Sequence, residues 1–133
     1  MQMAQQQHRP DARKILIVED HRDSREALSA LFEAFGYRVV VATNGLEAVE
    51  RALQERPDLI VMDIMMPEID GYAAARRIRS IPGFERTPII AVTAIDNGGE
   101  LALQAGMSDY VRKPVDIRGL LSLVRGWLSP TAS

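Results

Sequence analysis

Polar side chains follow the short apolar runs of this sequence at the points where strands would end. Glu19 and Asp20 follow one run, Asp63 a second, Thr93 a third and Lys113 a fourth. Ligands of open parallel sheets bind outside the carboxyl ends of the strands. If the runs are parallel neighbours, the sequence therefore predicts three carboxylates, one hydroxyl and one ammonium at the same edge.

Such a site suits a divalent cation and a phosphoryl group. Converging carboxylates repel each other unless they share a proton or a cation, and hard oxygen ligands without His or Cys favour Mg²⁺ over zinc. Mg²⁺ keeps waters and binds readily together with phosphate oxygens, which a nearby hydroxyl and ammonium would complement. An aspartate in this setting can itself be the nucleophile, through an aspartyl phosphate.

The elements that must position these side chains alternate along the chain. Apolar runs at 15–18, 39–41, 59–62 and 89–92, with a weaker one at 110–111, are separated by stretches of helical periodicity. This alternation is typical of βαβ units, in which helices cover a parallel sheet. We therefore predict an α/β fold with a five-stranded parallel sheet.

Capping and periodicity signals define the helices. Asp23 with Glu26, and Asn44 with Glu47, have the spacing of capping pairs at helix starts. Gly36 is placed to end the first helix. The inward positions we expect are Leu28, Leu31, Phe32 and Phe35 in the first helix, Leu46, Val49 and Leu53 in the second, Ala74, Ala75 and Ile78 in the third, and Ile117, Leu120, Leu121, Val124 and Leu128 in the fifth.

The fourth helix, near 97–104, is predicted to be weak. Gly98 and Gly99 lie in its first turn, and a glycine costs about 1 kcal/mol in a helix interior. We therefore expect this turn to fray.

Composition limits the class of protein. The 133 residues are 47% apolar and 26% charged, as in an ordinary globular domain. A net charge of −2 offers no basic surface for nucleic acid. The absence of cysteine suits a reducing cytoplasm, and no apolar run approaches membrane-spanning length. The polar, Gln-rich residues 1–13 are expected to form a flexible tail in which His8 has no role, and 130–133 a second tail.

Four stretches carry a family resemblance when they are taken in order. The chain resembles the receiver domains of response regulators in two-component signalling in the stretches KILIVED, LIVMDIMMPEIDGYAAARRIR, PIIAVTA and DYVRKP. The resemblance covers residues 14–128 and places a receiver domain at 14–129. It implies a doubly wound, flavodoxin-like three-layer fold of the stand-alone chemotaxis-regulator type, with strand order 2-1-3-4-5.

The resemblance also implies the chemistry of the site. Asp63 is the phosphoacceptor, and the metal, Mg²⁺ or Mn²⁺, binds Glu19, Asp20, Asp63 and the backbone carbonyl of Met65. The phosphoryl donor is a histidine kinase or a histidine phosphotransfer protein. Turnover of an external substrate is not expected, because the protein promotes only its own phosphorylation and dephosphorylation.

Further residues of the resemblance concern the response to phosphorylation. Thr93 and Lys113 contact phosphoryl oxygens, and Tyr110 turns inward when the Thr93 hydroxyl is drawn toward the phosphoryl group. Pro114 follows a cis peptide bond that aims Lys113 at the site.

Several of these residues have a plainer interpretation. Glu19 and Asp20 have the residue types that cap helices, Thr93 and Lys113 taken singly are ordinary polar residues, and Tyr110 fits fixed strand packing equally well. Leu123 and Trp127 lie beside the main apolar stripe of the last helix. They represent either the edge of the core or an exposed pair that serves a partner or a weak, phosphorylation-dependent dimer.

Alternative functions remain at this stage. The chain is either a freestanding regulator, a phosphorelay intermediate or a receiver excised from a hybrid histidine kinase, acting through an unidentified effector protein. A more distant alternative is a phosphatase with an aspartate nucleophile, but such enzymes need an acid/base carboxylate where Met65 stands. A flavodoxin-like cofactor module or a degenerate receiver would not require the acidic cluster.

Overall fold

The computed structural model describes residues 12–66 and 68–129. Apart from Ala12 and Arg13, the tails expected at 1–13 and 130–133 lie outside these residues, as does His8. Within the described ranges, no helix combines the length and the apolar character needed to cross a membrane.

Five parallel strands form one sheet, as predicted. They pair in the order β2-β1-β3-β4-β5, which is the flavodoxin-like order that the resemblance implied. The two central pairings on either side of β3 join it to β1 and β4. The bounds are β1 (Lys14–Val18), β2 (Arg38–Ala42), β3 (Leu59–Asp63), β4 (Ile89–Thr93) and β5 (Asp109–Arg112).

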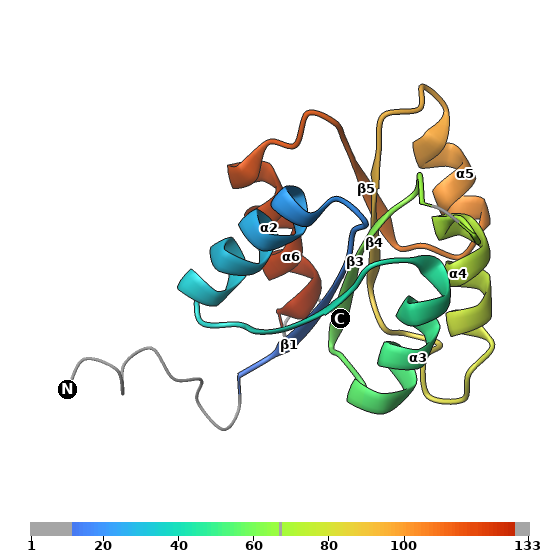
Figure 1. Cartoon of the computed structure of the whole chain (residues 1–133), viewed down its shortest axis with the longest axis horizontal. Coiled ribbons are helices and arrows are strands. Elements are labelled where there is room, and N and C mark those ends of the chain that lie inside the picture. The colour runs from blue at the N-terminus through green and yellow to red at the C-terminus, as the bar shows by residue number, and fades with distance from the viewer. Residues whose placement is uncertain (1–11, 67, 130–133) are drawn as a thin grey trace.

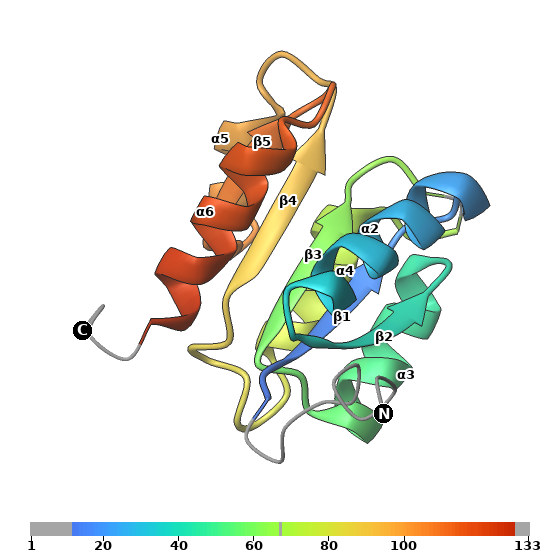
Figure 2. The same cartoon turned by 90° about the vertical axis from the view of Figure 1, so that its left-hand side faces the viewer.

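Helices cover both faces of the sheet, which makes three layers. Figure 1 shows α2 (Arg22–Ala34) and α6 (Ile117–Leu128) on one face, with α3 (Gly45–Glu55), α4 (Gly71–Arg79) and α5 (Gly98–Gln104) on the other. Figure 2 shows the strands running in one direction, so that their carboxyl ends share one edge of the sheet. The predicted helices are therefore confirmed in number and order within the described residues.

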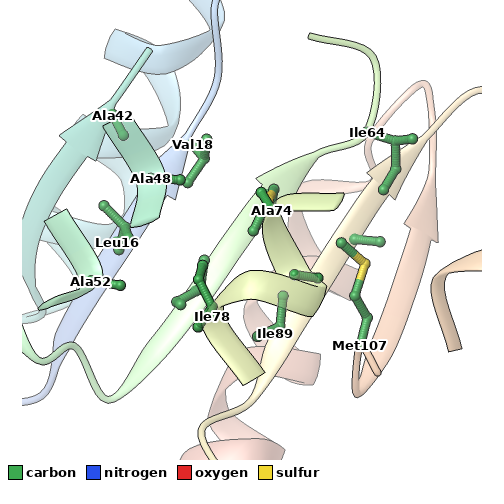
Figure 3. Close-up of a cluster of buried hydrophobic side chains, with 14 of the residues drawn as sticks. Leu16, Val18, Ala42, Ala48, Ala52, Ile64, Ala74, Ile78, Ile89 and Met107 are labelled. Carbon is green, nitrogen blue, oxygen red and sulfur yellow. The ribbon is translucent and has the colours of Figure 1, made fainter. Parts of the chain in front are cut away.

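The two faces of the sheet are packed with side chains of different size. Toward α2 and α6, the helices contribute large residues, namely Phe32, Leu120, Leu121, Val124 and Leu128. Toward α3, α4 and α5, they contribute mostly alanine, namely Ala48, Ala52, Ala74, Ala75 and Ala102, of which Figure 3 labels the first three. Alternation along the strands serves both layers, since Ile15 and Ile17 face one cluster while Leu16 and Val18 face the other.

Four of the expected inward residues are in fact exposed. Phe35 is 54% exposed, Leu46 42%, Leu53 48% and Ile117 45%. In α3 the buried residues that pack in the core cluster with the sheet are instead Ala48 and Ala52. A small side chain allows a helix axis to lie closer to the sheet, and the larger leucines are left on the outer side.

One of the two predicted capping pairs is confirmed. The Asn44 side chain accepts a hydrogen bond from the Glu47 N–H at 2.8 Å and begins α3. The Asp23 and Glu26 prediction is wrong, because His21 is the N-cap of α2 and Glu26 instead pairs with Arg22 at 3.2 Å.

Arg79 ties the molecule together at the amino ends of β4 and β5. Its guanidinium donates to the carbonyl oxygens of Phe84, Thr87 and Gly106 at 2.6 to 2.7 Å, and to Ser108 Oγ at 3.1 Å. The end of α4, the loop before β4 and the turn after α5 therefore share one cation.

Candidate functional site

Asp63 is the last residue of β3 and lies at the centre of the carboxyl edge. Asp63 is only 3% exposed, because β3 is covered on both faces and Asp63 pairs in register with Val92 of β4. One carboxylate oxygen accepts from the Met65 N–H at 3.2 Å, and the other from Lys113 Nζ at 3.3 Å. The aspartate is therefore held from its own loop and from the segment after β5.

Gly71 allows α4 to begin close against this strand end. A Cβ atom at Gly71 would lie 2.6 Å from the Asp63 carbonyl oxygen and 2.9 Å from the Ile64 Cα, which are distances that real Cβ atoms do not show. The Gly71 N–H donates to the Ile64 carbonyl at 3.0 Å. Position 71 therefore requires glycine for a steric reason, because the backbone at the start of α4 lies too close to the end of β3 for a side chain.

Glu19 is the second buried acid of the edge. It is 5% exposed, and its Oε2 accepts from the His21 N–H at 3.0 Å. Burial raises the pKa of Glu19 above its ordinary value, and the negative charge of Asp63 adds to the rise, while the His21 N–H and the Lys113 ammonium oppose it. Burial is thus the main reason that the ionised form of Glu19 is disfavoured.

Asp20 and His21 lie beside Glu19 on the solvent side of the site. Both are exposed, and a ring nitrogen of His21 lies within 4.8 Å of carboxylate oxygens of Glu19 and Asp20. His21 is not among the ligands predicted from the sequence. The signal that could have shown it is its position directly after the acid pair.

Thr93 and Lys113 come from the neighbouring strand ends. Thr93 is fully buried, and its Oγ1 accepts from the Ile95 N–H at 3.0 Å. The Lys113 N–H donates to the Thr93 carbonyl at 2.8 Å, which joins the two loops. The peptide bond between Lys113 and Pro114 is cis.

Two glycines connect Thr93 and Tyr110 to α5. A Cβ atom at Gly98 would collide with Thr93 Oγ1, and one at Gly99 would lie 2.5 Å from the Tyr110 ring. The Tyr72 hydroxyl of α4 donates to the Gly98 carbonyl at 3.3 Å. Tyr110 is 40% exposed, and its ring lies close to the backbone of Gly99. The glycines expected to weaken α5 thus allow its first turn to contact both residues closely.

Leu123 and Trp127 do not behave as a pair. Leu123 is half-buried against the cluster between the sheet and α6, whereas Trp127 is 41% exposed and donates from Nε1 to Asp109 Oδ2 at 3.1 Å. Both line a surface hollow together with Gly119, Ser122 and Gly126. The edge-of-core interpretation therefore fits Leu123, and the exposed one fits Trp127.

Three carboxylates and one ammonium at one strand edge leave an excess of negative charge. The strand ends bring Glu19, Asp63 and Lys113 close enough to influence one another electrically. Oxygen ligands with uncompensated charge are those that hard divalent cations prefer. A group with an exposed rim and a buried aspartate can thus bind a cation and present an oxygen nucleophile beside it.

Comparison with known proteins agrees with this arrangement. Residues 15–125 match the response regulator receiver domain family. The response regulator MprA of Mycobacterium leprae is 39% identical over 120 residues, which is 89% of this chain and 52% of MprA. The chain therefore spans about half the length of this curated relative.

Solved structures show the same likeness. The receiver domain of the sensor histidine kinase PA1611 from Pseudomonas aeruginosa, with a magnesium ion coordinated in its active site cleft, has a TM-score of 0.81 and 39% identity over 87% of this chain and 97% of that one. A chain of the co-crystal of the Saccharomyces cerevisiae phosphotransfer protein Ypd1 with the receiver domain of Ssk1 has a TM-score of 0.79 and 29% identity, covering 87% and 88%. The fold, the strand-end site and these matches together show that the chain belongs to the response regulator receiver domain family of two-component systems.

Proposed function

We propose that Asp63 accepts a phosphoryl group in a reaction that requires Mg²⁺ or Mn²⁺. The observation that carries this proposal is the 3.3 Å contact of Lys113 Nζ with a buried aspartate at the end of β3. A carboxylate fixed at a strand end, with one oxygen beside an ammonium, is oriented to attack a phosphorus atom. The PA1611 and Ypd1–Ssk1 structures support the class of reaction and of donor.

The residues of the edge fit the proposed cation. Glu19, Asp20 and Asp63 would hold it, with the main-chain carbonyl of Met65 as a further oxygen. Glu19 is buried beside the carboxylate of Asp63, and both burial and this neighbouring charge raise its pKa, so a bound cation would stabilise its ionised form. When bound, a divalent cation neutralises charge on the phosphoryl oxygens during transfer.

The side chains of the site have separate tasks in the transfer. A carboxylate oxygen of Asp63 forms a bond to phosphorus while the bond from phosphorus to the donor imidazole nitrogen breaks, and the imidazole leaves. The Lys113 ammonium stabilises the charge on a phosphoryl oxygen. Thr93 Oγ1 already accepts from the Ile95 N–H, so its own hydrogen is available to a phosphoryl oxygen.

We infer that Thr93 and Tyr110 carry the response outward. Thr93 is buried beneath α5, and the Tyr110 ring lies against Gly99 of the same helix. A displacement of Thr93 toward a phosphoryl group would therefore open space at Gly98, next to the residue that supports the tyrosine. Inward rotation of Tyr110 is the expected result.

The protein then acts through other proteins rather than on an external substrate. Met65 is 61% exposed and apolar at the position where a phosphatase of this chemistry needs an acid or base. The donor is a histidine kinase or a phosphotransfer protein, and Trp127 with the hollow around Leu123 supplies a surface for an effector or a weak dimer.

Incubation with a small phosphodonor and Mg²⁺, followed by intact mass spectrometry, tests the proposal. Wild-type protein is expected to gain one phosphoryl group, Asp63→Asn none, and Asp23→Asn, a change at an exposed residue of α2, as much as wild type. A gain that persists in Asp63→Asn, or its absence from wild type with both Mg²⁺ and Mn²⁺, would contradict it.

A further inference from the structure

Arg25 contacts the main chain of both acids at the solvent side of the site. It lies in the first turns of α2 and is half-buried, whereas Arg22, Asp23 and Glu26 around it are exposed. Its Nη1 donates to the Glu19 carbonyl oxygen at 3.1 Å and to the Asp20 carbonyl oxygen at 3.4 Å. One side chain thus holds two consecutive peptide groups.

These contacts complete the support of the acidic segment. On the sheet side, the Glu19 N–H donates to the Ala42 carbonyl at 3.0 Å. The Glu19 carboxylate accepts from the His21 N–H, and the His21 carbonyl accepts from the Arg25 N–H at 2.9 Å. The guanidinium binds the two carbonyls that the sheet does not, so the peptide group after Asp20 is held at its N–H by the Glu19 carboxylate and at its carbonyl by Arg25.

The charge of Arg25 is not used in an ion pair. Within the described ranges, no carboxylate oxygen lies within 4 Å of its guanidinium. It contributes only weakly to lowering the pKa of Glu47, for which the Thr43 N–H is the main cause. A guanidinium presents its donors in a fixed plane, which suits the orientation of carbonyl groups.

We propose that Arg25 is a positioning residue that fixes the Glu19 and Asp20 peptide groups and so raises the affinity of the site for a divalent cation. The inference rests on the proposed function, since it assigns to Arg25 the support of the same acids. Groups that orient metal ligands typically change metal affinity by about 10- to 100-fold when they are removed.

The sign of the effect separates positioning from electrostatics. Removal of a positive charge close to a cation site would by itself strengthen cation binding, because like charges repel. Loss of ligand orientation weakens it. Arg25 is half-buried at the solvent side of the site, where water and salt still screen part of its charge, so we expect the loss of orientation to exceed the gain in electrostatic energy.

Magnesium titration by calorimetry on the full chain tests the inference. Arg25→Met is expected to weaken Mg²⁺ binding about tenfold, and Arg25→Lys, which keeps the charge, is expected to bind with intermediate affinity. The matched control is Arg22→Met, which removes a charge from the same helix and loses only the exposed pair with Glu26. Its affinity is expected to equal or slightly exceed that of wild type.

Two further readouts exclude a general loss of structure. The melting temperature in EDTA reports folding without the cation, and the phosphorylation rate of Arg25→Met should approach that of wild type at saturating Mg²⁺. An unchanged or tighter Mg²⁺ affinity in Arg25→Met overturns the inference, as does a rate defect that saturation leaves in place. If Arg25→Met does not fold, wild-type affinity in Arg25→Lys overturns it. Wild-type protein that binds no Mg²⁺ would instead overturn the proposed function, and this inference with it.

Discussion

The two sides of the site are built by different means. The acidic side, from Glu19 to Arg25, is held by hydrogen bonds between polar groups, including two from one guanidinium. The glycine side comprises Thr93, Gly98, Gly99 and Tyr110, and it depends on close contact with a helix backbone that carries no Cβ.

This difference suits two different demands. Carboxylates that repel one another must be kept in place, and directional hydrogen bonds do this. A segment that must respond to a new group needs contacts that change over short distances, and van der Waals contact has this property. Under the proposed function, the part that binds the cation would thus be separate from the part that responds to phosphorylation.

Removal of an acid should have the largest effect on the acidic side. Asp20→Ala is expected to lower Mg²⁺ affinity by more than about 100-fold, above the range for groups that only orient ligands. Calorimetric titration measures the change, with Asp23→Ala as the control on the same exposed surface. Retention of affinity within the error of Asp23→Ala would remove Asp20 from the cation site.

Addition of a methyl group should disturb the glycine side. Gly99→Ala places a Cβ 2.5 Å from the Tyr110 ring, so we expect a loss of about 1 to 3 kcal/mol in the free energy of unfolding and a shifted Tyr110 resonance. Gly126 lies inside α6 with no atom within 4 Å of such a Cβ. Gly126→Ala should therefore stabilise by up to about 1 kcal/mol. Urea unfolding measures the free energy of unfolding of both variants. Equal changes in the two would mean that the close contact of Gly99 with Tyr110 has no energetic role.

A substitution at Glu47 tests the hydrogen bonds that lie next to the acidic side. Its pKa lies below the ordinary value, mainly because the Thr43 N–H donates to the carboxylate at 2.7 Å. A carboxyl with a lowered pKa stabilises the fold above its ordinary pKa and loses this contribution as the pH falls through the lowered value.

We therefore expect Glu47→Gln to lower the free energy of unfolding by about 1 kcal/mol at pH 7. The difference from wild type should shrink as the pH falls below the ordinary value of 4.5. Denaturant unfolding over this pH range measures the difference. Glu50→Gln, on an exposed position of α3, is the control, and a pH-independent difference would argue against the assigned cause.

Trp127 should show the smallest effect. Trp127→Phe removes the donor to Asp109 Oδ2 at an exposed position, so a change of about 0.5 kcal/mol or less in unfolding free energy is expected. A larger loss in urea unfolding would place Trp127 in the supporting structure of β5. Asp109→Asn, which keeps an acceptor oxygen, serves as the comparison.

The sequence alone predicted the positions of the strand ends, because buried parallel strands are continuous apolar runs and the polar residue that ends each is easily seen. The inner faces of α3 and α6 were predicted less well. Hydrophobicity ranks Leu46 and Leu53 above Ala48 and Ala52, yet the spacing between helix and sheet selects the alanines.

Two features of the site have almost no signal in a single sequence. Arg25 acts on carbonyl groups, which every residue possesses, so no residue type at a fixed spacing reveals its partners. Gly98 and Gly99 were judged by the cost of glycine in a helix, whereas their contacts with Thr93 and Tyr110 depend on tertiary structure.

The length of α5 and the fixation of its two ends have a mechanical consequence. At its start the helix meets Thr93 and the Tyr72 hydroxyl, and just beyond its end the Gly106 carbonyl is bound by Arg79. Seven residues span about 10 Å, too short a rod to bend. With the far end as a pivot, a sideways shift of about 1 Å at Gly98 tilts the axis by roughly 6°. Under the proposed switch, a displacement of about 1 Å near Thr93 would thus become a change of angle that a docked protein could sense.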